Sequence, residues 1–217
     1  HAVVGHYLPH CDPIHKVTII PRGMAGGLTW ALPEEDLFYL ARSKMQDEIA
    51  MALGGRVAEE LTFDEVTTGA SSDLEQVTRR ARAMVTRYGM SERLGPMIYG
   101  QKDELVFLGR EIGEQRDYSE AVAEEIDEEV RRIISEAYER ARHVLLEKRD
   151  KLEIVAQALL DVETLEREAF LRLMGEVSEP ETGGEPPQVP TPSKPRRQDE
   201  ATDAPPALDM PPSPAPA

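Results

Sequence analysis

The stretch PEEDLFYLARSKMQDEIAMALGGRVAEE, residues 33–60, carries the pattern that decides the fold. Its apolar residues recur every four positions and lay one stripe along a helix. They are Leu37, Ala41, Met45, Ile49, Leu53 and Val57. Pro33 and the three acids after it predict a helix start, because proline suits the first helical position and acids stabilise the positive end of the dipole. Gly54-Gly55 could end this helix or let a neighbouring backbone approach closely, and the continuing stripe favours the close approach.

Further helices follow along the chain. Ser72 and Glu75 have the spacing of a capping box and predict a second helix, which should end at Gly89. A long amphipathic helix is expected from Ser119 onward, with shorter helices around residues 152–160 and 165–173. Residues 16–20 and 28–32 flank a glycine-rich turn and could pair as a hairpin, and weaker strand candidates lie at 97–99 and 105–108. The predicted fold class is therefore mainly α with a small β-hairpin or sheet.

The composition changes sharply near Gly175. Twelve of the 17 prolines lie between Pro180 and Pro216, among Ala, Ser, Thr, Glu and Asp. A segment with so little apolar surface cannot offset its chain entropy and is expected to stay disordered. We therefore expect one folded domain, residues 1–175, and a disordered Pro-rich C-terminal tail, residues 176–217.

Charge and cysteine content exclude several classes of function. The 217 residues contain 25 Lys and Arg against 41 Asp and Glu, a net charge of −16. This sign argues against binding to nucleic acid and to anionic lipid, since both need a basic face. Cys11 is the only cysteine, so no disulfide within the chain and no thiolate zinc cage can form. No run of about 18 apolar residues occurs, so no membrane span is predicted in this stretch.

Four histidines lie within the first fifteen residues: His1, His6, His10 and His15. A small metal-binding module built from His6, His10 and Cys11 is one interpretation. Pro9 opposes it, because proline breaks the helix on which an i,i+4 histidine pair would share one face. Such a module predicts zinc uptake that survives the loss of His1 and of any ligand elsewhere in the chain.

Five segments carry a family resemblance. They read HAVVGHYL at 1–8, DPIHKVTIIPRG at 12–23, ALGGRVAEE at 52–60, VTTGASSDL at 66–74 and AMVTRYGMS at 83–91. In this order they resemble the FtsH family of AAA-coupled zinc metalloproteases, and the likeness covers about residues 1–170. It implies a helical peptidase domain.

The resemblance implies a zinc site. The family carries His-Glu-x-x-His followed by Ala-Val, so His1 matches the second histidine of that motif. The first histidine and the catalytic glutamate are expected four and three positions upstream of His1. The family's third ligand falls on Asp73, which its position alone would make an ordinary acid in the first turn of a helix.

Further site residues are expected from the same resemblance. Glu59 and Glu60 could orient a zinc histidine, or they could form the solvated acidic end of a helix. Gly27, Leu28 and Thr29 belong to an edge strand beside the zinc, to which a peptide substrate could add as an extra strand. The alternative is a hairpin edge softened by glycine.

The implied activity is zinc-dependent hydrolysis of peptide bonds in unfolded or membrane proteins. The resemblance implies a homo-hexamer anchored at the cytoplasmic face of the plasma (inner) membrane, with ATP and Mg used by an ATPase module. These 217 residues contain no phosphate-loop motif, and the chain by itself is expected to be soluble and inactive. The alternative is a non-catalytic pseudo-peptidase that serves as a scaffold for oligomerisation. The residues that precede His1 would discriminate the two.

Overall fold

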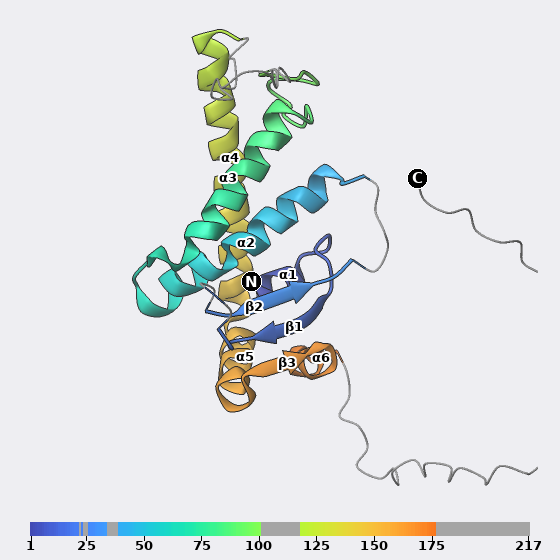
Figure 1. The fold of residues 1–217 in the computed structure, drawn as a ribbon, viewed down its shortest axis with the longest axis vertical. Helices are drawn as coiled ribbons and strands as arrows, with labels where there is room; N and C mark the ends of the chain where they lie inside the picture. Colours follow the sequence, from blue (N-terminus) through green and yellow to red (C-terminus); the bar gives the residue numbers. More distant parts are fainter. Residues whose placement is uncertain (22, 24–25, 34–38, 101–117, 177–217) are drawn as a thin grey trace, which may run out of the picture. The chain divides into compact units, whose positions relative to one another are not determined.

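The computed structural model describes residues 1–21, 23, 26–33, 39–100 and 118–176 (Figure 1). All of them belong to one unit, His1–Glu179. The fold is mainly α with a small sheet, as predicted. The expected tail lies outside the described residues from position 177 onward, so its disorder stays a prediction.

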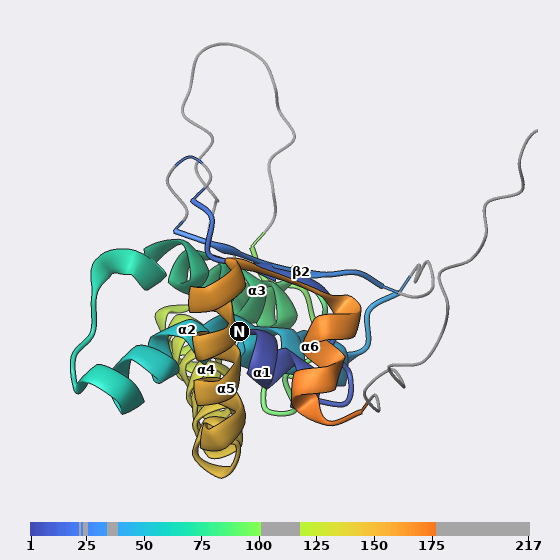
Figure 2. The same ribbon diagram turned by 90° about the horizontal axis from the view of Figure 1, so that it is seen from below.

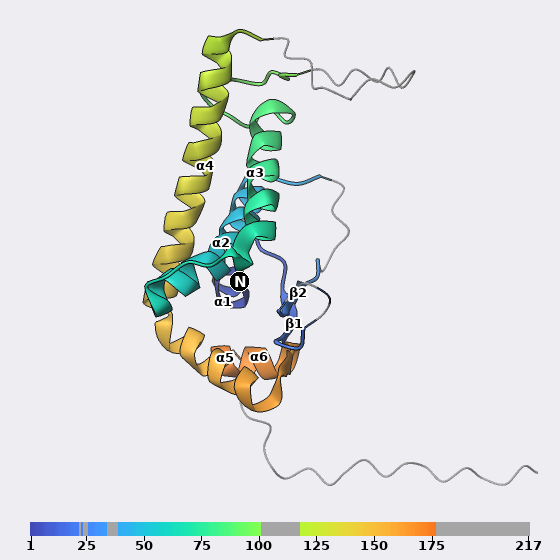
Figure 3. The same ribbon diagram turned by 60° about the vertical axis from the view of Figure 1, so that its left-hand side comes forward.

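The larger part of the unit is a group of helices. Its elements are α1 (Ala2–Tyr7), α2 (Arg42–Phe63), the 3₁₀ turn η1 (Thr68–Ala70), α3 (Ser71–Thr86) and α4 (Glu120–Glu147). Helices α2 and α3 both pack along the long helix α4 (Figure 3). Ser119 caps α4, because its hydroxyl accepts a hydrogen bond from the Val122 N–H at 3.3 Å.

A three-stranded antiparallel sheet makes up the rest, with the helices α5 (Arg149–Val162) and α6 (Arg167–Met174). Its strands are β1 (Ile14–Thr18), β2 (Leu28–Ala31) and β3 (Thr164–Glu166), in the order β2-β1-β3. Val17 in the central strand pairs with Thr29 on one side and with Leu165 on the other. Helices α1, α5 and α6 lie on one face of this sheet (Figure 2), and strand β2 forms an edge.

Two apolar clusters hold the unit together. The first cluster is shared by the helices α1, α2, α3 and α4. It includes Met45, Ile49, Leu53 and Val57, so this part of the predicted stripe is buried as expected. The second lies under the sheet and centres on Phe170, whose side chain is fully buried between β1, β3 and α5. Burial of large apolar side chains is the main favourable contribution to folding.

Several element boundaries differ from the predictions. Helix α2 begins at Arg42 rather than at Pro33, and Ala41 has extended backbone angles. Ala41, a member of the stripe, is also exposed, and the first member, Leu37, lies outside the described residues. The predicted capping box at Ser72 and Glu75 is wrong, because α3 already starts at Ser71 and has no side-chain cap.

Of the two weaker strand predictions, one is wrong and the other falls on residues that the structure does not describe. Residues 97–99 are described and form no strand, whereas the candidate at 105–108 lies outside the described residues. The hairpin is confirmed, although β1 ends at Thr18 and leaves Ile19 and Ile20 outside it. The third strand, β3, was expected to belong to a helix. Among the residues that the structure describes, no helix combines the length and apolar character needed to cross a membrane.

Candidate functional site

His1 lies at the start of α1 with both nitrogens of its ring directed at specific oxygen atoms. Its Nδ1 is 2.9 Å from the backbone carbonyl oxygen of Met51 in α2, and its Nε2 is 3.4 Å from Oδ2 of Asp73 in α3. A carbonyl can only accept, so Nδ1 carries the proton that is donated to Met51. In the neutral ring, Nε2 is then the nitrogen with the free lone pair, which is the form that binds a metal.

Two glycines of α2 make room for His1. The helix continues through Gly54 and Gly55 without a break. A Cβ added to Gly54 would lie 3.2 Å from the backbone nitrogen of His1, and one added to Gly55 would lie 2.6 Å from its Nε2. The predicted close approach of a neighbouring backbone is therefore confirmed at Gly54, whereas the close neighbour of Gly55 is the side chain of His1.

Asp73 is positioned by the turn that precedes α3. The hydroxyl of Thr67 donates to Oε1 of Glu59 at 2.7 Å and accepts from the Gly69 N–H at 3.2 Å. Arg56 also reaches the carbonyl oxygen of Thr67, at 3.4 Å. The last part of α2 thus holds the turn from which α3 starts, and Asp73 lies in the first turn of α3.

Opposing effects act on the pKa of His1. Burial lowers it, whereas the hydrogen bond with Asp73, the Met51 carbonyl and the negative charge of Asp73 raise it. The net result is a pKa above the ordinary value of 6.5. The neighbourhood therefore favours positive charge at Nε2, whether a proton or a metal ion supplies it.

The two facing atoms fit adjacent corners of a zinc site. With Zn–N and Zn–O bonds of about 2.0–2.2 Å in tetrahedral geometry, neighbouring donor atoms lie roughly 3.3–3.5 Å apart. The observed separation of Nε2 and Oδ2 is 3.4 Å. In the described part of the chain, no three His, Cys, Asp or Glu side chains gather to hold a metal ion.

The two candidate orienting glutamates have other partners. Glu59 holds Thr67, as described above, and Oε2 of Glu60 accepts a hydrogen bond from the hydroxyl of Tyr138 in α4. Burial, together with Glu60, raises the pKa of Tyr138 to about 12. The group that orients His1 is instead the carbonyl of Met51. Sequence reasoning missed it, because every residue carries a backbone carbonyl and no side chain signals this one.

The three residues expected to form a substrate-binding edge lie at the start of strand β2, with Gly27 directly before it. Leu28 and Thr29 belong to β2, which pairs only with β1 among the described strands. A Cβ added to Gly27 would lie 2.6 Å from the carbonyl oxygen of Thr18, so glycine permits a close backbone approach there. Leu28 is 43% exposed and is accessible to a partner.

The alternative module of His6, His10 and Cys11 does not converge. Nε2 of His6 is 3.3 Å from a carboxylate oxygen of Glu176, and its ring packs edge-on against Phe170. Nδ1 of His10 instead contacts Oδ2 of Asp47 at 2.8 Å. Burial raises the pKa of the Cys11 thiol to about 12, which disfavours the thiolate that a metal needs.

Comparison with known proteins gives a consistent answer. The model of peptidase family M41 matches residues 1–173. Two proteins named ATP-dependent zinc metalloprotease FtsH 1 are similar: one from Thermoanaerobacter sp. (strain X514) is 58% identical over 78% of this chain, and one from Thermomicrobium roseum is 56% identical over 76%. A protein named ATP-dependent zinc metalloprotease FtsH, from Chloroflexus aggregans, is 58% identical over 82%.

The chain spans 28%, 26% and 27% of the length of these three relatives, respectively. The region matched by the family model, residues 1–173, includes both His1 and Asp73. The chain belongs to peptidase family M41, as an FtsH protease domain.

Proposed function

We propose that this domain is the peptide-hydrolysing unit of a membrane-anchored, ATP-dependent zinc metalloprotease that acts on unfolded or membrane proteins. The observation that carries the proposal is the 3.4 Å separation between Nε2 of His1 and Oδ2 of Asp73, on two different helices. The names of the relatives support zinc and ATP dependence, because each is called an ATP-dependent zinc metalloprotease.

His1 and Asp73 would hold the zinc ion through Nε2 and a carboxylate oxygen. A catalytic zinc site takes three protein ligands and leaves one position for water. By the resemblance to His-Glu-x-x-His, residues upstream of His1 in the parent protein supply the remaining histidine and the glutamate that acts as general base. Zinc bound there would lower the pKa of its water and polarise the scissile carbonyl.

The residues of this chain contribute binding and orientation. The Met51 carbonyl holds a proton on Nδ1 of His1 and so keeps Nε2 available. The outer edge of β2, at Leu28 and Thr29, and Gly27 just before it would bind an extended peptide by backbone hydrogen bonds. Recognition through the backbone suits a protease that accepts unfolded chains of varied sequence, since it depends little on the side chains.

The proposed assembly follows from the same resemblance. The parent protein would be a homo-hexamer at the cytoplasmic face of the plasma (inner) membrane, with ATP and Mg bound by its ATPase module. A second candidate function is a non-catalytic scaffold, for which the Nε2–Oδ2 contact would be an ion pair rather than part of a metal site. The raised pKa of His1 is compatible with that alternative, so metal-dependent activity must decide.

The decisive assay is cleavage of an unfolded protein, such as reduced and alkylated casein, by the domain together with its natural upstream residues. Zinc-dependent cleavage that a chelator stops, that zinc restores and that Asp73→Ala abolishes is expected. The 217-residue chain alone should not cleave, since two donors do not make a catalytic site. Absence of zinc-dependent cleavage by the extended domain would favour the scaffold. Cleavage that persists in Asp73→Ala would remove Asp73 from the site.

A further inference from the structure

One turn of α2 contacts the ring of His1 through two residues four positions apart. The Met51 carbonyl oxygen lies 2.9 Å from Nδ1, and the Cα of Gly55 faces the opposite end of the ring. A Cβ on residue 55 would lie 2.6 Å from Nε2 and 2.9 Å from Cε1. Residues at i and i+4 share one helix face, so this single turn both binds the ring and limits its position.

The ring cannot relieve such a contact without losing an interaction. Real Cβ atoms essentially never approach a heavy atom closer than 3.0 Å, so the ring would have to move. Movement away from residue 55 must lengthen the bond from Nδ1 to Met51 or shift Nε2 relative to Asp73. The backbone of His1 is also restricted, because a Cβ on Gly54 would be 3.3 Å from its Cα.

Helix stability gives no reason for a glycine at this position. Gly55 lies well inside α2 and has no left-handed backbone angle. At an internal helical position, alanine is favoured over glycine by roughly fivefold in the equilibrium constant for helix formation. The three atoms nearest to the added Cβ all belong to the His1 ring, so the histidine is the neighbour that alanine would disturb.

We propose that Gly55 is a positioning residue: the absence of a Cβ there lets the His1 ring lie against α2, donate from Nδ1 to Met51 and direct Nε2 at Asp73. The consequence for zinc rests on the proposed function, whereas the effect on the ring does not. Gly55 acts through His1 and contacts neither substrate nor reacting atoms in this account.

The test uses the metal-free 217-residue chain labelled with ¹⁵N, at a pH above the pKa of His1. Long-range ¹H–¹⁵N correlation spectra report which ring nitrogen carries the proton. The unmodified chain should show His1 protonated at Nδ1 and unprotonated at Nε2. Gly55→Ala should lose this uniform tautomer, whereas the control Gly26→Ala should keep it, since a Cβ at residue 26 meets nothing within 4 Å. An unchanged His1 spectrum in Gly55→Ala would contradict the proposal.

A mutant cycle separates positioning from folding. In the His1→Ala background the ring is absent. There, Gly55→Ala should raise the equilibrium constant for folding, measured by urea unfolding, by roughly fivefold, because alanine is the better helix former. With His1 present, that gain should shrink or reverse. Equal effects in both backgrounds would overturn the proposal. If Gly55→Ala fails to fold, a folded double variant supports it and an unfolded double variant contradicts it.

A zinc measurement connects the ring to the metal. In the domain extended by its natural upstream residues, Gly55→Ala should lower zinc affinity by about 10–100-fold, the usual effect of disturbing a group that orients a ligand. If the extended domain binds no zinc at all, the proposed function fails while the tautomer result still decides the role of Gly55. Unchanged affinity in Gly55→Ala would contradict the positioning role.

Discussion

Glu59, near the end of α2, accepts a hydrogen bond from the hydroxyl of Thr67 at 2.7 Å, and this contact links α2 to the turn that leads into Asp73. The same helix supplies the Met51 carbonyl that binds His1. One helix therefore sets the position of both facing residues, one through a backbone carbonyl and the other through the turn before α3.

Thr67→Val removes this hydroxyl at nearly constant volume. Because the contact is exposed, the free energy of unfolding should fall by only about 1 kcal/mol. Zinc affinity of the extended domain should fall about tenfold, since Asp73 is less firmly held. Chelator competition measures this, with Asp73→Asn as the matched background. If Thr67→Val lowers zinc affinity as much in the Asp73→Asn background as in the unmodified domain, then Thr67 does not act through Asp73.

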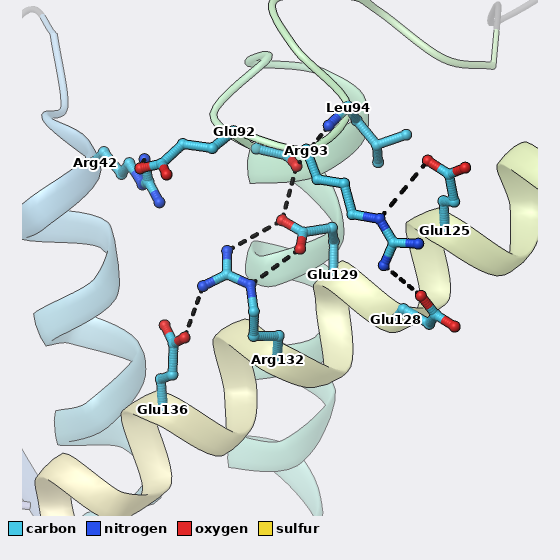
Figure 4. A network of polar contacts seen from close by, with 10 residues as sticks. Arg42, Glu92, Arg93, Leu94, Glu125, Glu128, Glu129, Arg132 and Glu136 are labelled. Carbon is cyan, nitrogen blue, oxygen red and sulfur yellow. Dashed lines mark hydrogen bonds and ion pairs between the residues drawn. The ribbon is translucent and has the colours of Figure 1, made fainter.

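Glu129 should make stability depend on acidic pH. It is buried on α4, where it accepts bonds from Arg132 at 3.0 Å and from Ser91 at 2.7 Å (Figure 4). Arg132 foremost, with Ser91 and Arg93, lowers the pKa of Glu129 against the opposing effect of burial. A lowered folded-state pKa means that this stabilisation is present above the unfolded pKa of 4.5 and is lost as the pH falls through the folded value.

Glu129→Gln should therefore lower the free energy of unfolding at pH 7 by about 2 kcal/mol, because it removes charge-assisted hydrogen bonds. It should also flatten the loss of stability below pH 4.5. Glu136→Gln is the matched control: its carboxylate binds the same Arg132 at 2.7 Å but is 52% exposed. Urea titrations across this pH range test the difference. An identical acid dependence in Glu129→Gln and the unmodified chain would refute the assignment.

Replacing Gly89 or Gly95 by alanine should lower the free energy of unfolding by different amounts. Both have positive φ, 57° and 73°, which strains any residue with a Cβ. A Cβ on Gly89 would also lie 2.8 Å from the backbone Cα of Pro96, whereas one on Gly95 meets nothing within 4 Å. We expect losses of about 2–4 kcal/mol for Gly89→Ala and about 1–2 kcal/mol for Gly95→Ala by urea unfolding. Equal losses would show that the contact with Pro96 relaxes freely.

Local patterns predicted the helices because their signal is periodic and repeats over many residues. The buried stripe from Met45 to Val57 is such a signal. Helix α2 does not extend back to Pro33, because Ala41 has extended backbone angles and Tyr39 and Leu40 before it are exposed, and a local signal from proline and acids does not show where the core ends. Strand β3 was missed because its three residues pair with residues 146 to 150 positions earlier in the chain, and no local pattern signals a partner so distant.

The candidate site was predictable only in part. The residues of the family motifs indicated His1 and Asp73, and the structure brings their side chains together. The contribution of Gly55 is a missing atom and that of Met51 is a backbone carbonyl. The glycine pair signalled a close approach in the sequence, but only the packing of α1 against α2 identifies the His1 ring as the neighbour of Gly55 and Met51 as its hydrogen-bond partner.

The most direct test of the central claim is zinc affinity of the domain with its natural upstream residues, measured by chelator competition. His1→Ala and Asp73→Asn should each lower the affinity by on the order of 100-fold or more, because each removes a ligand. Glu60→Gln, whose carboxylate binds Tyr138 in α4 instead, should leave it nearly unchanged. If the unmodified domain and all three variants bind zinc equally well, the assignment of His1 and Asp73 as ligands is contradicted.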